Sequence, residues 1–198
     1  MLILVRHPQT VYGAEGKLQG CKEDVSLSPL GLAQKDAIVN ELRNFSFVKV
    51  YTSPLSRCRD VARQIYKTYG VPLEIHEDLK DLNVGVVGGL HPTEFEQKYP
   101  EEWLLWTRDH YIERFPGGES LLEAKVRASR FLEKVDYREN VVILSHSSII
   151  PLIISCVTGI LTPCLGPILI SEGGITLVDP NQKLLVSSNY TGHLKSVL

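Results

Sequence analysis

The chain has 198 residues, of which 43% are hydrophobic and 22% are charged, and its formal net charge is -2. These values are typical of one folded domain and exclude a disordered chain. The nearly balanced charge gives no reason to expect a nucleic-acid partner, so any anion site must come from arginines placed locally. The four cysteines have no metal-ligand spacing and are expected to be reduced thiols.

The sequence shows no export signal at its beginning, so we expect a cytoplasmic protein. Residues 141–170 contain no Asp, Glu, Lys or Arg, which raises the alternative of a membrane span. Serines, prolines and glycines interrupt this segment before any unbroken apolar piece is long enough to cross a bilayer. A buried strand followed by a buried helix is therefore the favoured interpretation.

Short apolar runs alternate with helical patterns along most of the chain. The runs predict strands at residues 2–5, 48–51 and 141–144. Helices are predicted after Ser28-Pro29, after Ser53-Pro54 and over residues 119–135, because apolar side chains recur there at helical spacing. Strands that alternate with helices are typical of βαβ units, so we expect a parallel sheet with helices on both faces.

The C-terminal part predicts a different kind of pairing. Strand-like segments at residues 168–170, 175–178 and 184–186 are joined by turns at Gly173-Gly174 and at residues 179–182. This spacing indicates a hairpin that finishes the sheet. The predicted fold is a three-layer α/β/α sandwich, with a mostly parallel central sheet and an antiparallel edge.

Residues 1–198 are expected to form a single domain with an insertion, or cap region, at about residues 79–118. This region is rich in Gly, Pro and aromatic residues. The spacing of its aromatic side chains fits either a cover over a substrate pocket or a buried helical face. These side chains are Tyr99, Trp103, Trp106 and Tyr111.

Polar side chains follow three of the predicted strands at the points where the strands end. Arg6 and His7 follow the first, Arg57 comes soon after the second, and His146 follows the strand of the 140s. In an open parallel sheet the carboxyl ends of the strands face one edge, where ligands bind. We therefore expect two histidines and two arginines to meet at one site.

Seven segments carry a recognisable set of motifs in a fixed order. They are Leu4–Thr10, Gly16–Gly20, Leu27–Gln34, Thr52–Cys58, Pro116–Ser120, Ser145–Ser147 and Asn189–Leu194. Together they resemble the histidine phosphatase superfamily, whose branches include cofactor-dependent phosphoglycerate mutases and α-ribazole-phosphate phosphatases. The resemblance extends over nearly the whole chain.

The resemblance implies a metal-independent phosphatase that hydrolyses a small phosphomonoester. His7 would be the nucleophile and would form a covalent phosphohistidine. Arg6 and Arg57 would hold the phosphate oxygens in bidentate fashion, and His146 would stabilise charge on those oxygens. The family works without a metal, so neither a metal nor another cofactor is implied.

The same resemblance implies a set of phosphate-binding positions. Gln19 would contact the phosphate or a nearby substrate oxygen, and Thr10 and Ser147 are further candidates. Glu119 would fix an arginine or a histidine of the site. Gly13 stands where the family commonly has an Asn that would contact phosphate, so one donor is missing there.

Other departures concern the proton that a leaving alkoxide needs. Asp81 stands where the family typically supplies a Glu as general acid, and a misplacement of about 1 Å can cost on the order of 100-fold in rate. We expect Asp81 to be the acid, with Glu94 as the alternative. Val87-Gly88 replaces a usual Trp-Glu pair, and Pro8 replaces a glycine and restricts His7 to extended geometry.

Alternatives remain open for function. A phosphoglycerate mutase would share the fold but commonly carries extra inserted sequence, and a non-catalytic subunit would account for the departures at the acid. Zinc binding by the two histidines is disfavoured, because no third ligand sits at metal spacing and the arginines would repel a cation. The expected partner is a small phosphorylated metabolite, with α-ribazole 5′-phosphate, phosphoserine, phosphoglycerates and sugar phosphates all open. A homodimer through the C-terminal edge strand is a further possibility.

Overall fold

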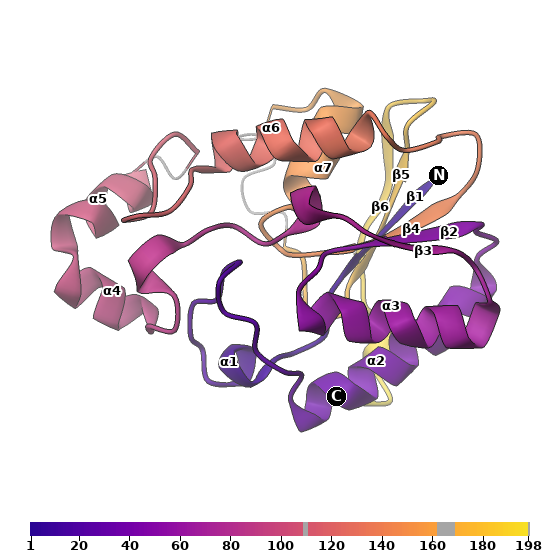
Figure 1. Ribbon diagram of the computed structural model, residues 1–198, viewed down its shortest axis with the longest axis horizontal. Coiled ribbons are helices and arrows are strands. Elements are labelled where there is room, and N and C mark those ends of the chain that lie inside the picture. The colour runs from indigo at the N-terminus through magenta and orange to yellow at the C-terminus, as the bar shows by residue number, and fades with distance from the viewer. Residues whose placement is uncertain (109–110, 162–168, 198) are drawn as a thin grey trace.

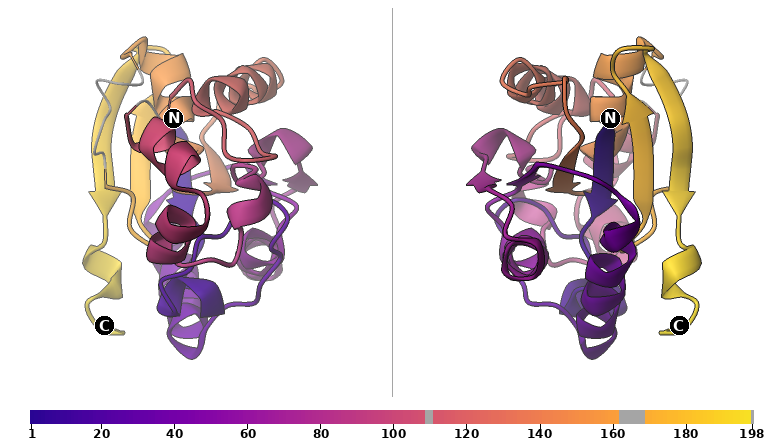
Figure 2. Two further views of the ribbon diagram at one scale, coloured as in Figure 1. Left: turned by 90° about the vertical axis from the view of Figure 1, so that its left-hand side faces the viewer. Right: turned by 90° about the vertical axis from the view of Figure 1, so that its right-hand side faces the viewer.

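The computed structural model describes residues 1–108, 111–161 and 169–197. Six strands form one sheet in the order β3-β2-β4-β1-β5-β6. Their bounds are Leu2–Arg6 (β1), Lys49–Thr52 (β2), Leu73–Ile75 (β3), Val141–Ser145 (β4), Ile175–Asp179 (β5) and Leu184–Tyr190 (β6). The first four run parallel, whereas β5 and β6 are antiparallel to their neighbours. Figure 2 shows β5 and β6 at one side of the sheet.

Helices cover both faces of this sheet (Figure 1). The long helices are α2 (Pro29–Glu41) and α3 (Ser56–Tyr69) on one face, and α6 (Leu121–Leu132) and α7 (Ile150–Thr158) on the other. Leu2 and Leu4 pack with α6 and α7, whereas Ile3 and Val5 pack with α2 and α3. This alternation follows from the two-residue period of a strand. The predicted three-layer sandwich with an antiparallel edge is confirmed.

The helix starts agree with their sequence signals. Ser28 caps α2 by accepting a hydrogen bond from the backbone of Gly31, and Pro29 occupies the first helical position. Ser120 caps α6 in a reciprocal capping box with Glu123. Since α6 therefore begins at Leu121, the carboxylate before its cap is free to make other contacts.

The region at about residues 79–118 contains two helices, α4 (Pro92–Lys98) and α5 (Pro100–Arg108), at one end of the molecule (Figure 1). Phe95 is fully buried there. Its ring lies 5.3 Å from that of Trp103 and 5.9 Å from that of Phe115. Trp106 stacks on Phe115 at 5.1 Å. Tyr99, Trp103 and Trp106 thus pack on the buried Phe95, which accounts for their helical spacing, while each of them stays partly exposed.

Some short elements differ from the expectation. Leu169 and Ile170 are not in a strand, and Ile168 lies outside the described residues. The carbonyl oxygen of Ile170 instead accepts a hydrogen bond from the guanidinium of Arg6. The sequence also did not predict β3, α1 (Val11–Ala14) or the short 3-10 turns. Those turns are Leu42–Asn44, Glu77–Leu79, Gly85–Val87 and Gly192–Leu194.

The structure can be compared with two further expectations, one about the cysteines and one about a membrane span. Cys21, Cys58 and Cys156 are free thiols, and Cys164 lies outside the described residues. Within the described part of the chain, no helix has both the length and the apolar character that crossing a bilayer requires.

Candidate active site

The ends of three neighbouring strands bring the predicted residues together. Arg6 at the end of β1 pairs with Ser145 at the end of β4, and β2 lies on the other side of β4. His7 and His146 follow directly, and their ring centroids lie 5.2 Å apart. His146 Nε2 lies 2.9 Å from the hydroxyl of Ser53, which follows β2. Residues distant in sequence meet because these parallel strands end at the same edge.

The residue after His7 fixes the tautomer of its imidazole. Nδ1 lies 2.7 Å from the backbone carbonyl oxygen of Pro8. A carbonyl oxygen only accepts, so Nδ1 carries the proton and Nε2 keeps the lone pair. The backbone is fixed as well, because His7 N–H donates to Ser145 and its carbonyl accepts from Gly173 N–H, both at 3.1 Å. His7 therefore presents a nucleophilic nitrogen in a defined direction.

Burial and positive neighbours keep both histidines uncharged. Burial lowers the pKa of His7 well below its usual range, and the nearby His146, Arg57 and Arg6 lower it further. Burial also lowers the pKa of His146 well below its usual range, with the nearby arginines acting in the same direction. Both imidazoles are thus neutral at physiological pH, the form that a nitrogen nucleophile needs.

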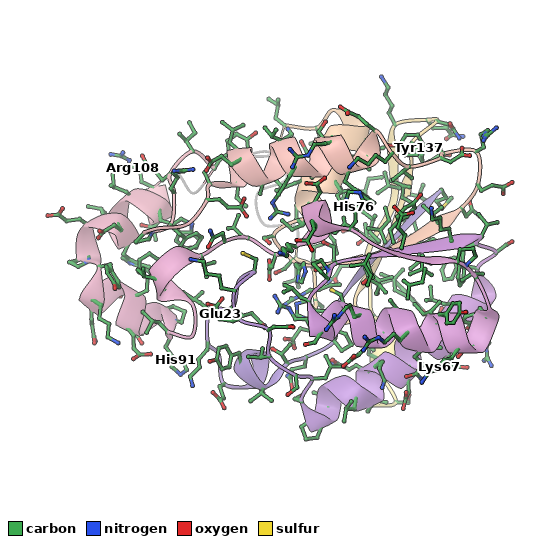
Figure 3. The ribbon with its side chains drawn as sticks, viewed as in Figure 1. Glu23, Lys67, His76, His91, Arg108 and Tyr137 are labelled. Atoms are coloured by element: carbon green, nitrogen blue, oxygen red, sulfur yellow. The ribbon has the colours of Figure 1, made fainter. Side chains whose placement is uncertain are left out.

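Arg57 of α3 is fully buried, and its guanidinium forms hydrogen bonds with two loops. Its Nη1 donates to the carbonyl oxygen of Glu23 at 2.9 Å, and its Nη2 donates to that of Gly20 at 3.0 Å. Nη2 also donates to Asp81 Oδ2 at 2.9 Å. Glu23 lies in the loop between α1 and α2, beside the start of α3 (Figure 3). Arg57 is therefore a rigid positive charge with one carboxylate partner.

Asp81 lies within the same cluster and is engaged on both oxygens. Its Oδ1 accepts from the hydroxyl of Ser148 at 2.5 Å and from the backbone N–H of Leu82 at 2.9 Å. Its Oδ2 accepts from Arg57 and lies 3.3 Å from His146 Nδ1, outside hydrogen-bond geometry. The predicted acid is thus close to the histidines, and its carboxylate also holds Arg57.

Glu94, the alternative acid, caps a helix in the cap region. Its Oε2 accepts a hydrogen bond from the backbone of His91 at 2.9 Å and closes the capping box at the start of α4. This hydrogen bond, together with Lys98, lowers the pKa of Glu94. Figure 3 places His91 at the α4 end of the molecule. A carboxylate that caps a helix and has a lowered pKa is a poor proton donor.

Three buried nitrogens around His7 lack partners. Among the described residues, Arg6 Nε, Arg57 Nε and His146 Nδ1 are buried without a hydrogen-bond partner. Leaving such groups unpaired is costly, and native structures rarely do so without a reason. The two Nε atoms are obligate donors on positive groups, so an anion with several oxygens is the ligand that suits them.

Arg6 is held less completely than Arg57. Its Nη1 donates to the carbonyl oxygen of Ile170 at 2.5 Å, and its Nη2 lies 3.8 Å from Glu172 Oε1. Burial lowers the pKa of Arg6 from its usual value, against the opposing charges of Glu172 and Asp81. A side chain that is about one fifth exposed, with donors still free, can turn to a ligand.

The predicted phosphate-binding positions fall into two groups. Thr10 donates to Gln19 Oε1 at 2.9 Å and accepts from the backbone N–H of Gly13 at 3.0 Å, so these three form one hydrogen-bonded unit. Ser147, by contrast, is exposed. Its neighbour Ser148 makes the contact with Asp81. The Ser-rich run after β4 indicated a polar loop but not which serine points inward.

Glu119 fixes an arginine, Arg127 of α6, through hydrogen bonds of 2.8 and 3.3 Å. It also accepts from the backbone N–H of Asn83 at 2.8 Å. Arg127 in turn donates to three backbone carbonyls within residues 78–81, at 2.6 to 3.0 Å. We call Glu119 and Arg127 the α6 clamp. It holds the segment that carries Asp81, and Arg127 was not predicted from the sequence.

The structure corrects one premise of the case against a metal, because a third side chain that could bind a metal does lie close to the two histidines. Among the described residues, one group has metal-ligating atoms close together: His7, Asp81 and His146 lie within 4.8 Å of one another. Asp81 is already paired with Arg57, and Arg6 acts on His7 from nearby. A divalent cation would have to displace a guanidinium and bear its repulsion, so these donors fit an anion better than a cation.

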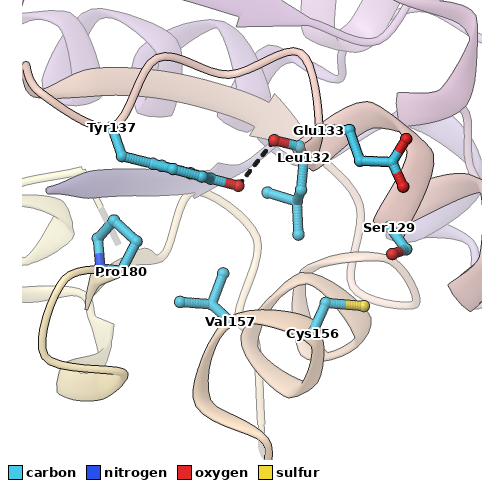
Figure 4. A pocket seen from close by; sticks show the side chains of 7 residues that line it. All are labelled: Ser129, Leu132, Glu133, Tyr137, Cys156, Val157 and Pro180. Carbon is cyan, nitrogen blue, oxygen red and sulfur yellow. Dashed lines mark hydrogen bonds between the residues drawn. The ribbon is translucent and has the colours of Figure 1, made fainter.

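A hollow elsewhere on the surface lacks comparable chemistry (Figure 4). It is lined by Ser129, Leu132, Glu133, Tyr137, Cys156, Val157 and Pro180. The Tyr137 hydroxyl donates to the carbonyl of Leu132 at 2.8 Å. Burial raises the pKa of the Cys156 thiol, which leaves it a poor nucleophile. The cluster at the strand ends is therefore the candidate active site.

Comparison with known proteins identifies the family to which this site belongs. Residues 2–188 match the model of the histidine phosphatase superfamily, branch 1. The chain belongs to this superfamily. The resemblance seen in its motifs is thereby confirmed over nearly the whole sequence.

Three proteins that are similar to this histidine phosphatase are named as phosphatases. Phosphoserine phosphatase 1 of Hydrogenobacter thermophilus is 32% identical over 74% of this chain and 70% of its own. A metal-independent phosphoserine phosphatase of Arabidopsis thaliana is 34% identical over 75% of this chain and 65% of its own. The α-ribazole phosphatase of Shigella flexneri shares the fold, with a TM-score of 0.87, 24% identity, and coverage of 96% of each chain. The predicted activity, a phosphoric monoester hydrolase, is supported.

Proposed function

We propose that this histidine phosphatase hydrolyses a small phosphomonoester through a phosphohistidine on His7, without a metal. The observation that carries the proposal is the neutral imidazole of His7, whose Nδ1 proton is committed to Pro8. It stands beside Arg6 and Arg57, whose buried Nε atoms have no hydrogen-bond partner within the part of the chain that the structure describes. A nucleophile surrounded by unused cationic donors suits phosphoryl transfer, in which positioning and charge stabilisation dominate.

The reaction would have two balanced steps. In the first, the Nε2 lone pair of His7 forms a bond to phosphorus while the bond to the ester oxygen breaks, and an acid protonates the departing alkoxide. In the second, water attacks the phosphohistidine, loses a proton to the same group, and releases inorganic phosphate and free His7. Arg6, Arg57 and His146 would donate to the phosphoryl oxygens in both steps.

Asp81 is the group that we assign to the proton transfer. Its Oδ2 lies 3.3 Å from His146 Nδ1, and the carboxyl group is buried. To act as the acid, Asp81 would first take up a proton from solvent, which is favoured when a bound phosphate replaces it as the partner of Arg57. Ser148, Leu82 and the α6 clamp fix its position. After giving up its proton, the same carboxylate would be in place to accept one from the attacking water.

We expect a small phosphorylated metabolite as substrate. Two relatives are named phosphoserine phosphatases, and a third, an α-ribazole phosphatase, shares the fold. These names make phosphoserine and α-ribazole 5′-phosphate the first substrates to test. β6 is an edge strand, and pairing of two copies across it stays a prediction.

A panel of phosphomonoesters tests the proposal and separates it from its alternatives. The purified protein should release phosphate from p-nitrophenyl phosphate, with inhibition by vanadate and no effect of EDTA. Exchange between 3-phosphoglycerate and its isomer at a rate exceeding hydrolysis would instead identify a mutase. Absence of turnover across phosphoserine, α-ribazole 5′-phosphate, phosphoglycerates and sugar phosphates would identify a non-catalytic subunit. EDTA-sensitive activity would contradict the metal-independent mechanism.

A further inference from the structure

Glu172 is a carboxylate of the site that the sequence motifs did not indicate. The segment that carries it is bonded to the nucleophile's own backbone. Gly173 N–H donates to the carbonyl of His7, and Arg6 N–H donates to that of Gly174, both at 3.1 Å. The side chain of Glu172 is about one fifth exposed, and its Oε1 lies 3.8 Å from Arg6 Nη2. The backbone that follows Glu172 is thus fixed beside the candidate phosphate site, while its side chain is held more loosely than that of Asp81.

The carboxyl group of Glu172 occupies space that the missing side chain at Gly13 leaves open. A Cβ atom at Gly13 would lie 2.3 Å from Glu172 Oε1 and 3.3 Å from Thr10 Oγ1. Gly13 has no positive φ, so its backbone does not require a glycine. Its lack of a side chain therefore makes room for Glu172. The sequence had indicated that a phosphate donor is missing at this same position.

The charges of the site balance when both carboxylates are ionised. Arg57 is paired with Asp81 and Arg6 with Glu172, while burial keeps His7 and His146 neutral. A pocket without net positive charge attracts a phosphate dianion poorly. Removal of one negative charge would leave Arg6 uncompensated and free to hold the anion.

The surroundings of Glu172 favour its neutral form. Burial raises the pKa of Glu172, and the charge of Arg6 and a hydrogen bond from Gln9 oppose this shift. Among the described residues, Arg6 is the charged group whose field acts on Glu172. Arg6 in turn is influenced by Asp81 and Arg57 on its other side. A carboxyl group in this setting takes up a proton at a higher pH than an exposed glutamate.

We propose that Glu172 is a further residue of the phosphate site, which blocks Arg6 as an anion and donates a hydrogen bond to a phosphoryl oxygen as a neutral acid. The proposal rests on the proposed function, because it takes the Arg6 site as the phosphate site. The protonated carboxyl group of Glu172 would replace the phosphate donor that is missing at Gly13. Binding of phosphate and uptake of one proton by Glu172 are then coupled.

Calorimetric titration with inorganic phosphate tests this inference without requiring turnover. Wild type, Glu172→Gln and the control Glu74→Gln are compared at about pH 5 and about pH 8. Glu74 is a matched control because its carboxylate pairs with Lys49 at the far edge of the sheet. The titration of phosphate itself cancels in the ratio of the dissociation constants of two variants at one pH.

At about pH 8 we expect Glu172→Gln to bind phosphate about tenfold more tightly than wild type, because a neutral amide replaces the competing anion. This advantage should shrink as the pH is lowered to about 5, because protonation of Glu172 removes the competing anion and turns the carboxyl group into a donor. The Glu74→Gln control should follow wild type at both pH values. Binding by Glu172→Gln that is equal to or weaker than wild type at about pH 8 would overturn the proposal.

Gly13→Ala provides a second test that leaves the carboxylate in the chain. Its added methyl group should push Glu172 away from Arg6 and tighten phosphate binding at about pH 8, but should have no effect in the Glu172→Gln background. An equal effect in both backgrounds would show that Glu172 is not involved. If no variant binds phosphate at either pH, while circular dichroism shows that all are folded, the proposed function itself fails.

Discussion

At the scale of single residues, each guanidinium of the site has its own carboxylate, and the two pairs differ in exposure. Arg57 and Asp81 are buried, with a contact of 2.9 Å. Arg6 and Glu172 are looser, at 3.8 Å, and are partly exposed. Breaking a buried pair typically costs about 3–5 kcal/mol, whereas a loose, partly exposed pair is worth little. The Arg57–Asp81 pair therefore contributes to stability as well as to the site, whereas the Arg6–Glu172 pair can separate when a ligand binds.

Asp81→Asn separates the acid role from the role in holding Arg57. If Asp81 protonates the leaving group, the variant should lose on the order of 100-fold in kcat with an alkyl phosphate. It should lose much less with p-nitrophenyl phosphate, whose leaving group needs no proton. Steady-state kinetics on the two substrates measures this difference. Equal losses of kcat on both substrates would mean that Asp81 acts only by placing Arg57. The control is Glu94→Gln, whose kcat we expect to be unchanged on both substrates.

The motifs predicted the residues that meet at the strand ends better than the residues that hold them in place. His7, Arg6, Arg57, His146 and Asp81 were all predicted, because strand ends and motif spacing place them. Their supporting partners Ser148, Arg127 and Glu172 were not predicted. An arginine on an amphipathic helix has no sequence signal that distinguishes a buried clamp from a solvated charge. Glu172 had only an indirect signal, the gap at Gly13.

At the scale of elements, α6 ties the cap region to the site. Its Arg127 holds the carbonyls of residues 78–81, and Glu119 at the start of the helix holds Arg127. These contacts fix the backbone immediately before Leu82, where the chain enters the cap region. The position of Asp81 therefore depends on a helix that does not itself contribute to the strand-end cluster.

Arg127→Ala should lower kcat on the order of 100-fold with a smaller change in KM, because released carbonyls let Asp81 move by about 1 Å. The matched control is Arg130→Ala on the same helix. Arg130 contacts the side chain of Asp78, and more than half of its side chain is exposed. We expect that control to retain most of its activity. A loss of kcat in Arg130→Ala as large as in Arg127→Ala would contradict a specific role for the clamp.

The strength of the sequence signal differs between the strands of the sheet. β1 and β4 are continuous apolar runs, because helices cover the sheet on both faces and bury every side chain of these strands or nearly so. Their sequence signal is therefore strong. β3 has three mostly exposed residues at the edge of the sheet and carries no such signal. In the described part of the expected strand at residues 168–170, the carbonyl of Ile170 bonds to the side chain of Arg6, and neither Leu169 nor Ile170 is in a strand.

At the scale of the whole molecule, the site makes stability depend on pH. Burial lowers the pKa values of His7 and His146 well below those of the unfolded chain. Near pH 6.5 and below, the unfolded chain binds protons that the folded chain does not, so stability falls as pH falls. The contribution of the neutral histidines is fully present above the unfolded pKa.

Thermal or urea unfolding at a series of pH values measures this dependence. Below about pH 6.5, each buried histidine should reduce the free energy of unfolding by about 1.4 kcal/mol per pH unit. The double variant His7→Asn/His146→Asn should show a flatter profile between about pH 6.5 and pH 5. Identical slopes for wild type and the double variant would contradict the view that these histidines are neutral in the folded protein.

The most direct test of the central claim is to trap the covalent intermediate. Wild type is mixed with a radiolabelled phosphomonoester, stopped within milliseconds in alkaline denaturant, and digested for mass spectrometry. We predict base-stable, acid-labile label on the peptide that contains His7, and no label in His7→Ala. Label on another residue, or turnover by the wild type at full rate with no labelled His7 at any time, would contradict the mechanism.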